Sequence, residues 1–182
     1  MVIKRAIFLD RDGVVNRNRP DCIHNYDQFQ FIPGSFDAIV RLCRQGLIPA
    51  LITNQSCIGR AWVPESRIRD IHETLQRRLM MKGGGFTNVY YCPHNPKAGC
   101  RCRKPEALML RKALLDYNVS PMQAVFVGDN VTDFLASKRA GIPFILVKTG
   151  YGEESLKKID PKDSGLLSIQ PDLAHTADFL LK

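Results

Sequence analysis

Five short apolar segments alternate with amphipathic segments along the chain. The apolar segments show no polar alternation and predict buried strands at residues 6–9, 48–53, 89–91, 124–127 and 144–147. A helical spacing of apolar positions predicts helices at residues 35–45 (with Ser35 as the N-cap), 64–82, 105–115, 132–140 and 173–181. Uniformly apolar strands joined by helices are typical of a parallel sheet covered on both faces. The expected fold class is therefore α/β, a Rossmann-like parallel sheet of about five strands with helices on both faces.

Two polar segments interrupt this pattern. Residues 17–22 are rich in turn-forming side chains and are predicted to form a flap, whereas residues 151–171 are predicted to be irregular. No repeat or low-complexity stretch marks a boundary, so residues 1–182 are predicted to form one domain. No apolar run approaches the roughly 20 residues that cross a bilayer, and the N-terminus lacks a signal-peptide pattern. We expect a cytoplasmic protein without membrane contact.

Polar side chains with matching chemistry stand where the predicted strands end. Asp10 and Asp12, Thr53 and Asp129 follow or end three different apolar strands, and Lys104 opens the helix after another strand. The carboxyl ends of parallel strands share one edge of a sheet, so these residues are expected to converge there. Neighbouring carboxylates repel, and either a hard cation such as Mg²⁺ or protonation of one acid relieves that repulsion. The set predicts a site for Mg²⁺ and a phosphate group.

A second group of ligand-type residues lies within eleven positions. It consists of Cys92, His94, Cys100 and Cys102, in a segment that contains turn-forming Pro and Gly. Three thiolates and an imidazole suit tetrahedral Zn²⁺, and four protein ligands leave no open position, so the zinc is expected to be structural. A cluster of free thiols is the alternative. The remaining cysteines, Cys22, Cys43 and Cys57, are scattered and are expected to be reduced thiols.

The charge balance indicates an anionic partner. Lys and Arg number 26 against 18 Asp and Glu, which gives a formal net charge of +8. This surplus is compatible with nucleic acid or with a small anionic substrate. The basic residues form no run of five and no stripe interleaved with aromatic residues, which favours the small substrate.

Four short motifs occur in order along most of the chain. They are Asp-Arg-Asp-Gly-Val-Val at 10–15, Ile-Thr-Asn at 52–54, Lys-Pro at 104–105 and Gly-Asp-Asn-Val-Thr-Asp at 128–133. In this order and on this strand pattern, they resemble the four motifs of the haloacid dehalogenase (HAD) superfamily.

The resemblance implies a covalent phosphatase mechanism. Asp10 is expected to attack phosphorus and form an aspartyl-phosphate, while Asp12 transfers protons to the leaving group and from water. Thr53 and Lys104 are expected to hold phosphoryl oxygens. The resemblance also implies that Mg²⁺ is bound by Asp10, Asp129 and the backbone carbonyl of Asp12. The residue one helical turn later, Asp133, either binds the metal through water or caps a helix.

The cysteine segment resembles that of a smaller group of families within the HAD superfamily. Its pattern C-x-H…C-x-C-R-K-P is similar to that of D-glycero-D-manno-heptose 1,7-bisphosphate 7-phosphatases and of the related histidinol-phosphate phosphatases. The first family implies hydrolysis of a small phosphorylated sugar in the heptose branch of lipopolysaccharide precursor synthesis. Histidinol phosphate is the alternative substrate, and an inactive, zinc-stabilised module for nucleic acid is a distant alternative. We expect a monomer with an open crevice and no cap domain.

Several residues are expected to contact the substrate, by position in these motifs: Asn54, Gln55, Ser56, Arg103, Lys104 and Asn130. Alternatively, Arg103 bonds loop carbonyls and Asn130 caps the helix that follows it, and both alternatives stay open. Two positions depart from the heptose-enzyme pattern, Cys57 where Gly is usual and Asp21–Cys22 where Gly-Tyr is frequent. Three histidines have no evident partner and are predicted to lie on the surface: His24, His72 and His175.

Overall fold

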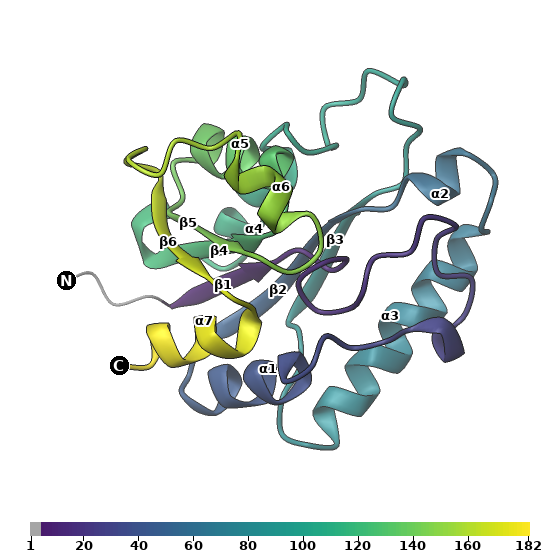
Figure 1. Ribbon diagram of the computed structural model, residues 1–182. Coiled ribbons are helices and arrows are strands. Elements are labelled where there is room, and N and C mark those ends of the chain that lie inside the picture. Colours follow the sequence, from purple (N-terminus) through teal and green to yellow (C-terminus); the bar gives the residue numbers. More distant parts are fainter. Residues whose placement is uncertain (1–4) are drawn as a thin grey trace.

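Six parallel strands form the central sheet in the computed structural model, which describes residues 5–182. The strands are β1 (Ala6–Leu9), β2 (Ile48–Asn54), β3 (Asn88–Cys92), β4 (Ala124–Gly128), β5 (Phe144–Val147) and β6 (Leu166–Gln170). Their order across the sheet is β3-β2-β1-β4-β5-β6, so β1 lies between β2 and β4 (Figure 1). The chain changes direction across the sheet at β1, and open α/β folds bind ligands beyond the carboxyl ends of the strands at such a point.

Helices cover both faces of the sheet (Figure 1). One face packs against α1 (Ser35–Arg44), α3 (Glu65–Met80) and α7 (Leu173–Leu180); the other packs against α4 (Leu108–Asp116), α5 (Val131–Ala140) and α6 (Gly152–Leu156). Two short 3₁₀ helices, Tyr26–Gln28 and Pro121–Gln123, and the single turn α2 (Ser56–Gly59) complete the elements.

The alternation of side chains along β1 divides the core into two clusters. Ile7 and Leu9 belong to the cluster beneath α1, α3 and α7, whereas Ala6 and Phe8 belong to the cluster beneath α4 and α5. All four are fully buried, as expected for a central strand of a sheet covered on both faces. The predicted fold class and the five predicted strands are confirmed.

The sheet contains one strand more than predicted. Residues 151–171 were expected to be irregular, but they include α6 and the edge strand β6. Within residues 5–182, β6 pairs with β5 alone, and its side chains are half-buried or exposed. An edge strand needs no continuous apolar run, and the mixed sequence of Leu166–Gln170 therefore gave no strand signal.

Two helix starts also differ from the prediction. The helix expected from Pro105 begins at Leu108, because a turn in which Glu106 N–H donates to Arg103 O (2.8 Å) comes first. Ser35, expected to cap its helix, is the first helical residue, and its hydroxyl donates to Val15 O at 2.7 Å.

Residues 5–182 contain no separate cap domain, so the loops beyond the carboxyl edge of the sheet alone bound the site. Over the same residues, no helix combines the length and apolar character needed to span a membrane.

Candidate active site

The strand ends bring the predicted polar residues together. Asp10 follows β1 and its N–H donates to Val127 O of β4 at 2.9 Å, while Thr53 is the penultimate residue of the neighbouring strand β2. Asp129 follows β4 directly, and Lys104 reaches the same edge from the loop after β3. All four residues are almost completely buried.

Lys104 is the centre of a buried charge cluster. Its Nζ lies 2.9 Å from Asp10 Oδ1 and 2.7 Å from Asp133 Oδ1, and it donates to Ile52 O at 2.8 Å. Burial acts to lower the pKa of Lys104, but the two carboxylates outweigh it and the pKa is raised. The side chain therefore carries a full positive charge.

The carboxylates around Lys104 exceed its charge. Ligand oxygens of Asp10, Asp129 and Asp133 lie within 4.8 Å of one another. Burial raises the pKa of Asp10 to about 7, and Asp133 adds to this effect while Lys104 opposes it. Burial, together with Asp133 and Asp10, raises the pKa of Asp129 to about 8. When all three acids are ionised, one ammonium leaves two surplus negative charges, and a divalent cation with oxygen ligands fits this donor set.

Glycines allow two loops to enclose Asp129. A Cβ atom on Gly13 or on Gly150 would lie 2.0 Å from Asp129 Oδ2, and both residues have positive φ angles (+89° and +60°). The next residue, Tyr151, donates its backbone N–H to Asp129 Oδ2 at 2.8 Å. The loop after β5 thus belongs to the site, and this contribution could not be predicted because it comes from a glycine and a backbone N–H rather than from an acidic side chain.

Asp12 lies outside the carboxylate cluster and is held by three other side chains. Arg11 Nη2 donates to both carboxylate oxygens at 2.9 Å, Asn16 Nδ2 donates to Oδ1 at 2.8 Å, and Gln55 Nε2 donates to Oδ2 at 3.0 Å. Burial acts to raise the pKa of Asp12, but Arg11 and the hydrogen bonds from Asn16 and Gln55 outweigh it and the pKa is lowered. The surroundings therefore raise the pKa of Asp10 and lower the pKa of Asp12.

Side chains next to the candidate catalytic residues form hydrogen bonds that hold those residues in place. Asn54 Nδ2 donates to Lys104 O and Lys104 N–H donates to Asn54 Oδ1, both at 3.1 Å. Gln55 Nε2 also donates to Thr53 Oγ1 at 2.9 Å.

Asn130 caps α5, since its Oδ1 accepts from Thr132 N–H at 3.0 Å. Asp133 is likewise a cap, because its Oδ2 accepts from the backbone N–H of Asn130 at 3.1 Å.

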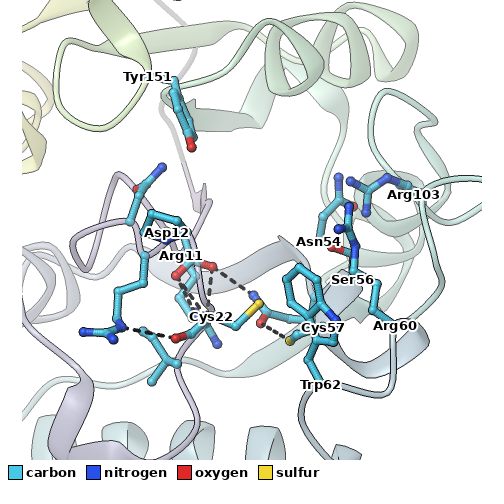
Figure 2. A pocket seen from close by; sticks show the side chains of 15 residues that line it. Arg11, Asp12, Cys22, Asn54, Ser56, Cys57, Arg60, Trp62, Arg103 and Tyr151 are labelled. Atoms are coloured by element: carbon cyan, nitrogen blue, oxygen red, sulfur yellow. Dashed lines mark hydrogen bonds and ion pairs between the residues drawn. The ribbon is translucent and has the colours of Figure 1, made fainter.

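A cavity of about 350 Å³ opens above Asp12 (Figure 2). Arg103, Asn54 and Ser56 lie opposite Arg11 and Asp12, and Gln55 also lines the cavity. Asn130 is not among the lining residues. Arg19, Arg60 and Arg103 make the wall basic, and Nη1 of Arg103 is buried with no hydrogen-bond partner in the part of the chain that the structure describes. Such a wall suits an anionic ligand.

The predicted zinc ligands form one compact group. The three Sγ–Sγ distances among Cys92, Cys100 and Cys102 lie between 3.2 and 3.7 Å, and His94 Nδ1 is 3.2 Å from Cys102 Sγ. Ligand sulfurs of a tetrahedral zinc site lie about 3.7 Å apart when each Zn–S bond is about 2.3 Å long. Burial raises the pKa of Cys92 to about 12, so a thiolate there needs a cation. The donor set fits zinc.

One histidine prediction was wrong. His24 and His175 are exposed as expected, but His72 on α3 is buried, and its Nε2 lies 3.2 Å from Arg11 Nη1. The helical spacing of α3 offered a signal, since His72 lies four residues after Ile68 and three before Leu75, both of which are buried.

The parallel sheet and the Asp–Lys–Asp cluster at its carboxyl edge are features of the class of HAD-like hydrolases. The HAD-hydrolase-like family matches residues 101–173. The chain is 39% identical over 177 residues to the D-glycero-beta-D-manno-heptose-1,7-bisphosphate 7-phosphatase of Pseudomonas putida, covering 97% of this chain and 99% of that enzyme. It is 41% identical to the enzyme of the same name from Pasteurella multocida, covering 81% and 84% of the two chains.

A solved structure agrees with these relatives. The D,D-heptose 1,7-bisphosphate phosphatase of B. bronchiseptica, complexed with magnesium and phosphate, superposes with a TM-score of 0.91 at 36% identity, covering 97% of this chain and 98% of that one. The chain belongs to this family of HAD-like phosphatases.

Proposed function

We propose that this chain is a Mg²⁺-dependent phosphatase that removes the 7-phosphate of D-glycero-D-manno-heptose 1,7-bisphosphate. The observation that carries the proposal is a buried Asp10–Lys104–Asp129 cluster below a basic cavity, in a chain 39% identical to such an enzyme over nearly its whole length. The reaction would belong to the heptose branch of lipopolysaccharide precursor synthesis, in the cytoplasm. A monomeric enzyme with one domain, residues 1–182, is part of the same proposal.

The proposed chemistry starts at Asp10. Its carboxylate attacks the phosphorus atom and forms an aspartyl-phosphate, while Lys104 Nζ and Thr53 Oγ1 hold phosphoryl oxygens. Asp10 and Asp129, with the backbone carbonyl of Asp12, would hold Mg²⁺, and Asp133 lies close enough to contribute. The ion, when bound, offsets the repulsion between an anionic nucleophile and an anionic phosphate.

Asp12 is the proposed proton carrier. A phosphate dianion in the cavity favours the protonated form of Asp12, because neighbouring negative charges repel. Asp12 then gives this proton to the leaving alkoxide and later accepts one from the water that hydrolyses the intermediate. Its position at the cavity wall, 29% exposed and away from Lys104, suits exchange with ligand and water.

The basic wall supports a substrate with two phosphates. Arg60 and Arg103 face the cavity from the loops after β2 and β3, and forked guanidinium groups bind phosphate bidentately. Ser56, Asn54 and Gln55 line the same cavity, whereas Asn130 is proposed to act through its cap. Histidinol phosphate has one phosphate and a cationic amine, which these arginines would repel.

A comparison of substrates tests the proposal. We expect kcat/KM with Mg²⁺ to be at least about tenfold higher for heptose 1,7-bisphosphate than for histidinol phosphate or fructose 1,6-bisphosphate, a difference of about 1.4 kcal/mol in transition-state binding. Preference for histidinol phosphate would move the enzyme to histidine synthesis. Salt-sensitive retention of DNA or RNA without phosphatase activity would instead support a binding module.

Zinc is proposed to brace the loop between β3 and α4. Cys92 is the last residue of β3, and Cys102 directly precedes Arg103 and Lys104. Closing this segment on a metal would fix both basic side chains relative to the sheet.

Acidification is expected to weaken magnesium binding between pH 8 and pH 6. The pKa values of Asp129 and Asp10 are raised to about 8 and about 7, so both carboxylates take up protons in this range and Mg²⁺ must displace them. Affinity should fall about tenfold per pH unit for each proton displaced. Calorimetric titration in buffers with different ionisation enthalpies measures both affinity and proton release. A constant affinity with no proton release between pH 6 and pH 8 would contradict the raised pKa values.

A further inference from the structure

A buried chain of polar contacts connects α3 to Asp12. His72 Nε2 lies 3.2 Å from Arg11 Nη1, and Nη2 of the same guanidinium donates to both oxygens of Asp12. Arg11 is 2% exposed and His72 is 6% exposed. Neither the motifs of the sequence nor the mechanism proposed above gives His72 a role.

The direction of the first contact is fixed by chemistry. A guanidinium has only donors, so His72 Nε2 must be the acceptor, which places the imidazole proton on Nδ1. Burial and the nearby Arg11 charge lower the pKa of His72 to about 3, so the ring is neutral. The His72 ring lies against the Tyr91 ring of β3, with 5.8 Å between centroids.

Arg11 joins the two proposed catalytic aspartates. Its backbone N–H donates to Asp10 Oδ1 at 2.7 Å, while its guanidinium holds Asp12. The guanidinium binds the Asp12 carboxylate through Nη2, and through Nε at 3.4 Å from Oδ1, which leaves Nη1 to be held by His72. Without an acceptor at position 72, the buried Nη1 loses its partner, and a long side chain gains freedom to rotate away from Asp12.

We infer that His72 is a positioning residue, which accepts a hydrogen bond from Arg11 and so holds the guanidinium that orients the Asp12 carboxyl group toward the cavity. The inference rests on the proposed function, because orientation of Asp12 affects turnover only if Asp12 transfers the proton. His72 itself does not line the cavity, so it should influence catalysis without changing substrate contacts.

The test compares two leaving groups in two variants. His72→Leu removes the acceptor, whereas His72→Gln keeps an acceptor near the position of Nε2. A sugar alkoxide needs the proton from Asp12 in order to leave, but 4-nitrophenolate leaves without one. We expect His72→Leu to lower kcat on the sugar bisphosphate about tenfold or more with KM changed less than about twofold, and His72→Gln to recover most of it. The pre-steady-state burst of nitrophenolate from 4-nitrophenyl phosphate should stay within about twofold of the original protein.

His175→Leu provides the matched control, since this histidine is exposed on α7. An equal loss on both phosphate esters, or no loss on either, overturns the positioning role. A ¹⁵N spectrum that shows a protonated Nε2 on His72 overturns it independently of turnover. If the unsubstituted protein hydrolyses neither ester, the proposed function fails, and the ¹⁵N spectrum still decides whether the Arg11 contact exists.

Discussion

Replacing Asp10 by Asn is expected to reduce phosphate release to less than about one per cent of the original activity, because an amide cannot serve as the nucleophile. The substitution is nearly isosteric and removes one negative charge from a buried cluster that already contains Asp129 and Asp133. The carboxamide oxygen can still accept from Arg11 N–H, as Asp10 Oδ1 does at 2.7 Å. We therefore expect the folded structure and the melting temperature to survive.

Asp178→Asn is the control for this experiment. Asp178 is exposed on α7 and forms a surface ion pair with Arg41, far from the site, so its loss should leave turnover unchanged. Steady-state release of phosphate and the thermal unfolding curve are measured for both variants. Activity of Asp10→Asn above about one per cent, with a contamination control, would exclude the covalent mechanism.

Replacing Cys100 by Ser is expected to lower the free energy of unfolding more than Asp10→Asn or Cys43→Ser does. A serine hydroxyl is a poor zinc ligand, and the remaining Cys92, His94 and Cys102 would form an incomplete site. Since binding of structural zinc contributes directly to the free energy of folding, the variant should lose bound zinc and unfold at a clearly lower temperature. Activity should fall with it, because Lys104 lies two residues beyond the last ligand.

Cys43→Ser is the matched substitution outside the cluster. Cys43 is half-buried in α1, and its thiol donates to Gly85 O at 3.4 Å, a bond that a serine hydroxyl can replace. Zinc content is measured by elemental analysis of the folded proteins and stability by thermal unfolding. Equal zinc content and equal melting temperatures in the two variants would show that Cys100 binds no structural metal.

The central strands of the sheet could be predicted from the sequence because each is marked by a local run of apolar residues. β1, β4 and β5 are continuous apolar runs and β2 is apolar up to Ile52, since a strand buried on both faces leaves no room for polar alternation. The parallel arrangement then placed Asp10, Thr53 and Asp129 at one edge without any knowledge of side-chain contacts.

Features set by tertiary contacts could not be predicted in this way. β6 forms because β5 offers it a partner, and its own sequence is ambiguous. The buried position of His72 depends on Arg11, which is 61 residues away in the sequence. The start of α4 at Leu108 likewise depends on a turn that places Lys104 beside Asn54. Each of these features is settled by a neighbour from a distant segment of the chain.

The regiochemistry of the reaction tests the central claim most directly. The protein is incubated with Mg²⁺ and D-glycero-D-manno-heptose 1,7-bisphosphate, and ³¹P resonances of the two ester phosphates are followed with time, with Asp10→Asn as the blank. We predict that the 7-phosphate signal is replaced by inorganic phosphate while the 1-phosphate signal persists. Loss of the 1-phosphate, or no release beyond that of the Asp10→Asn blank, would contradict the proposed function.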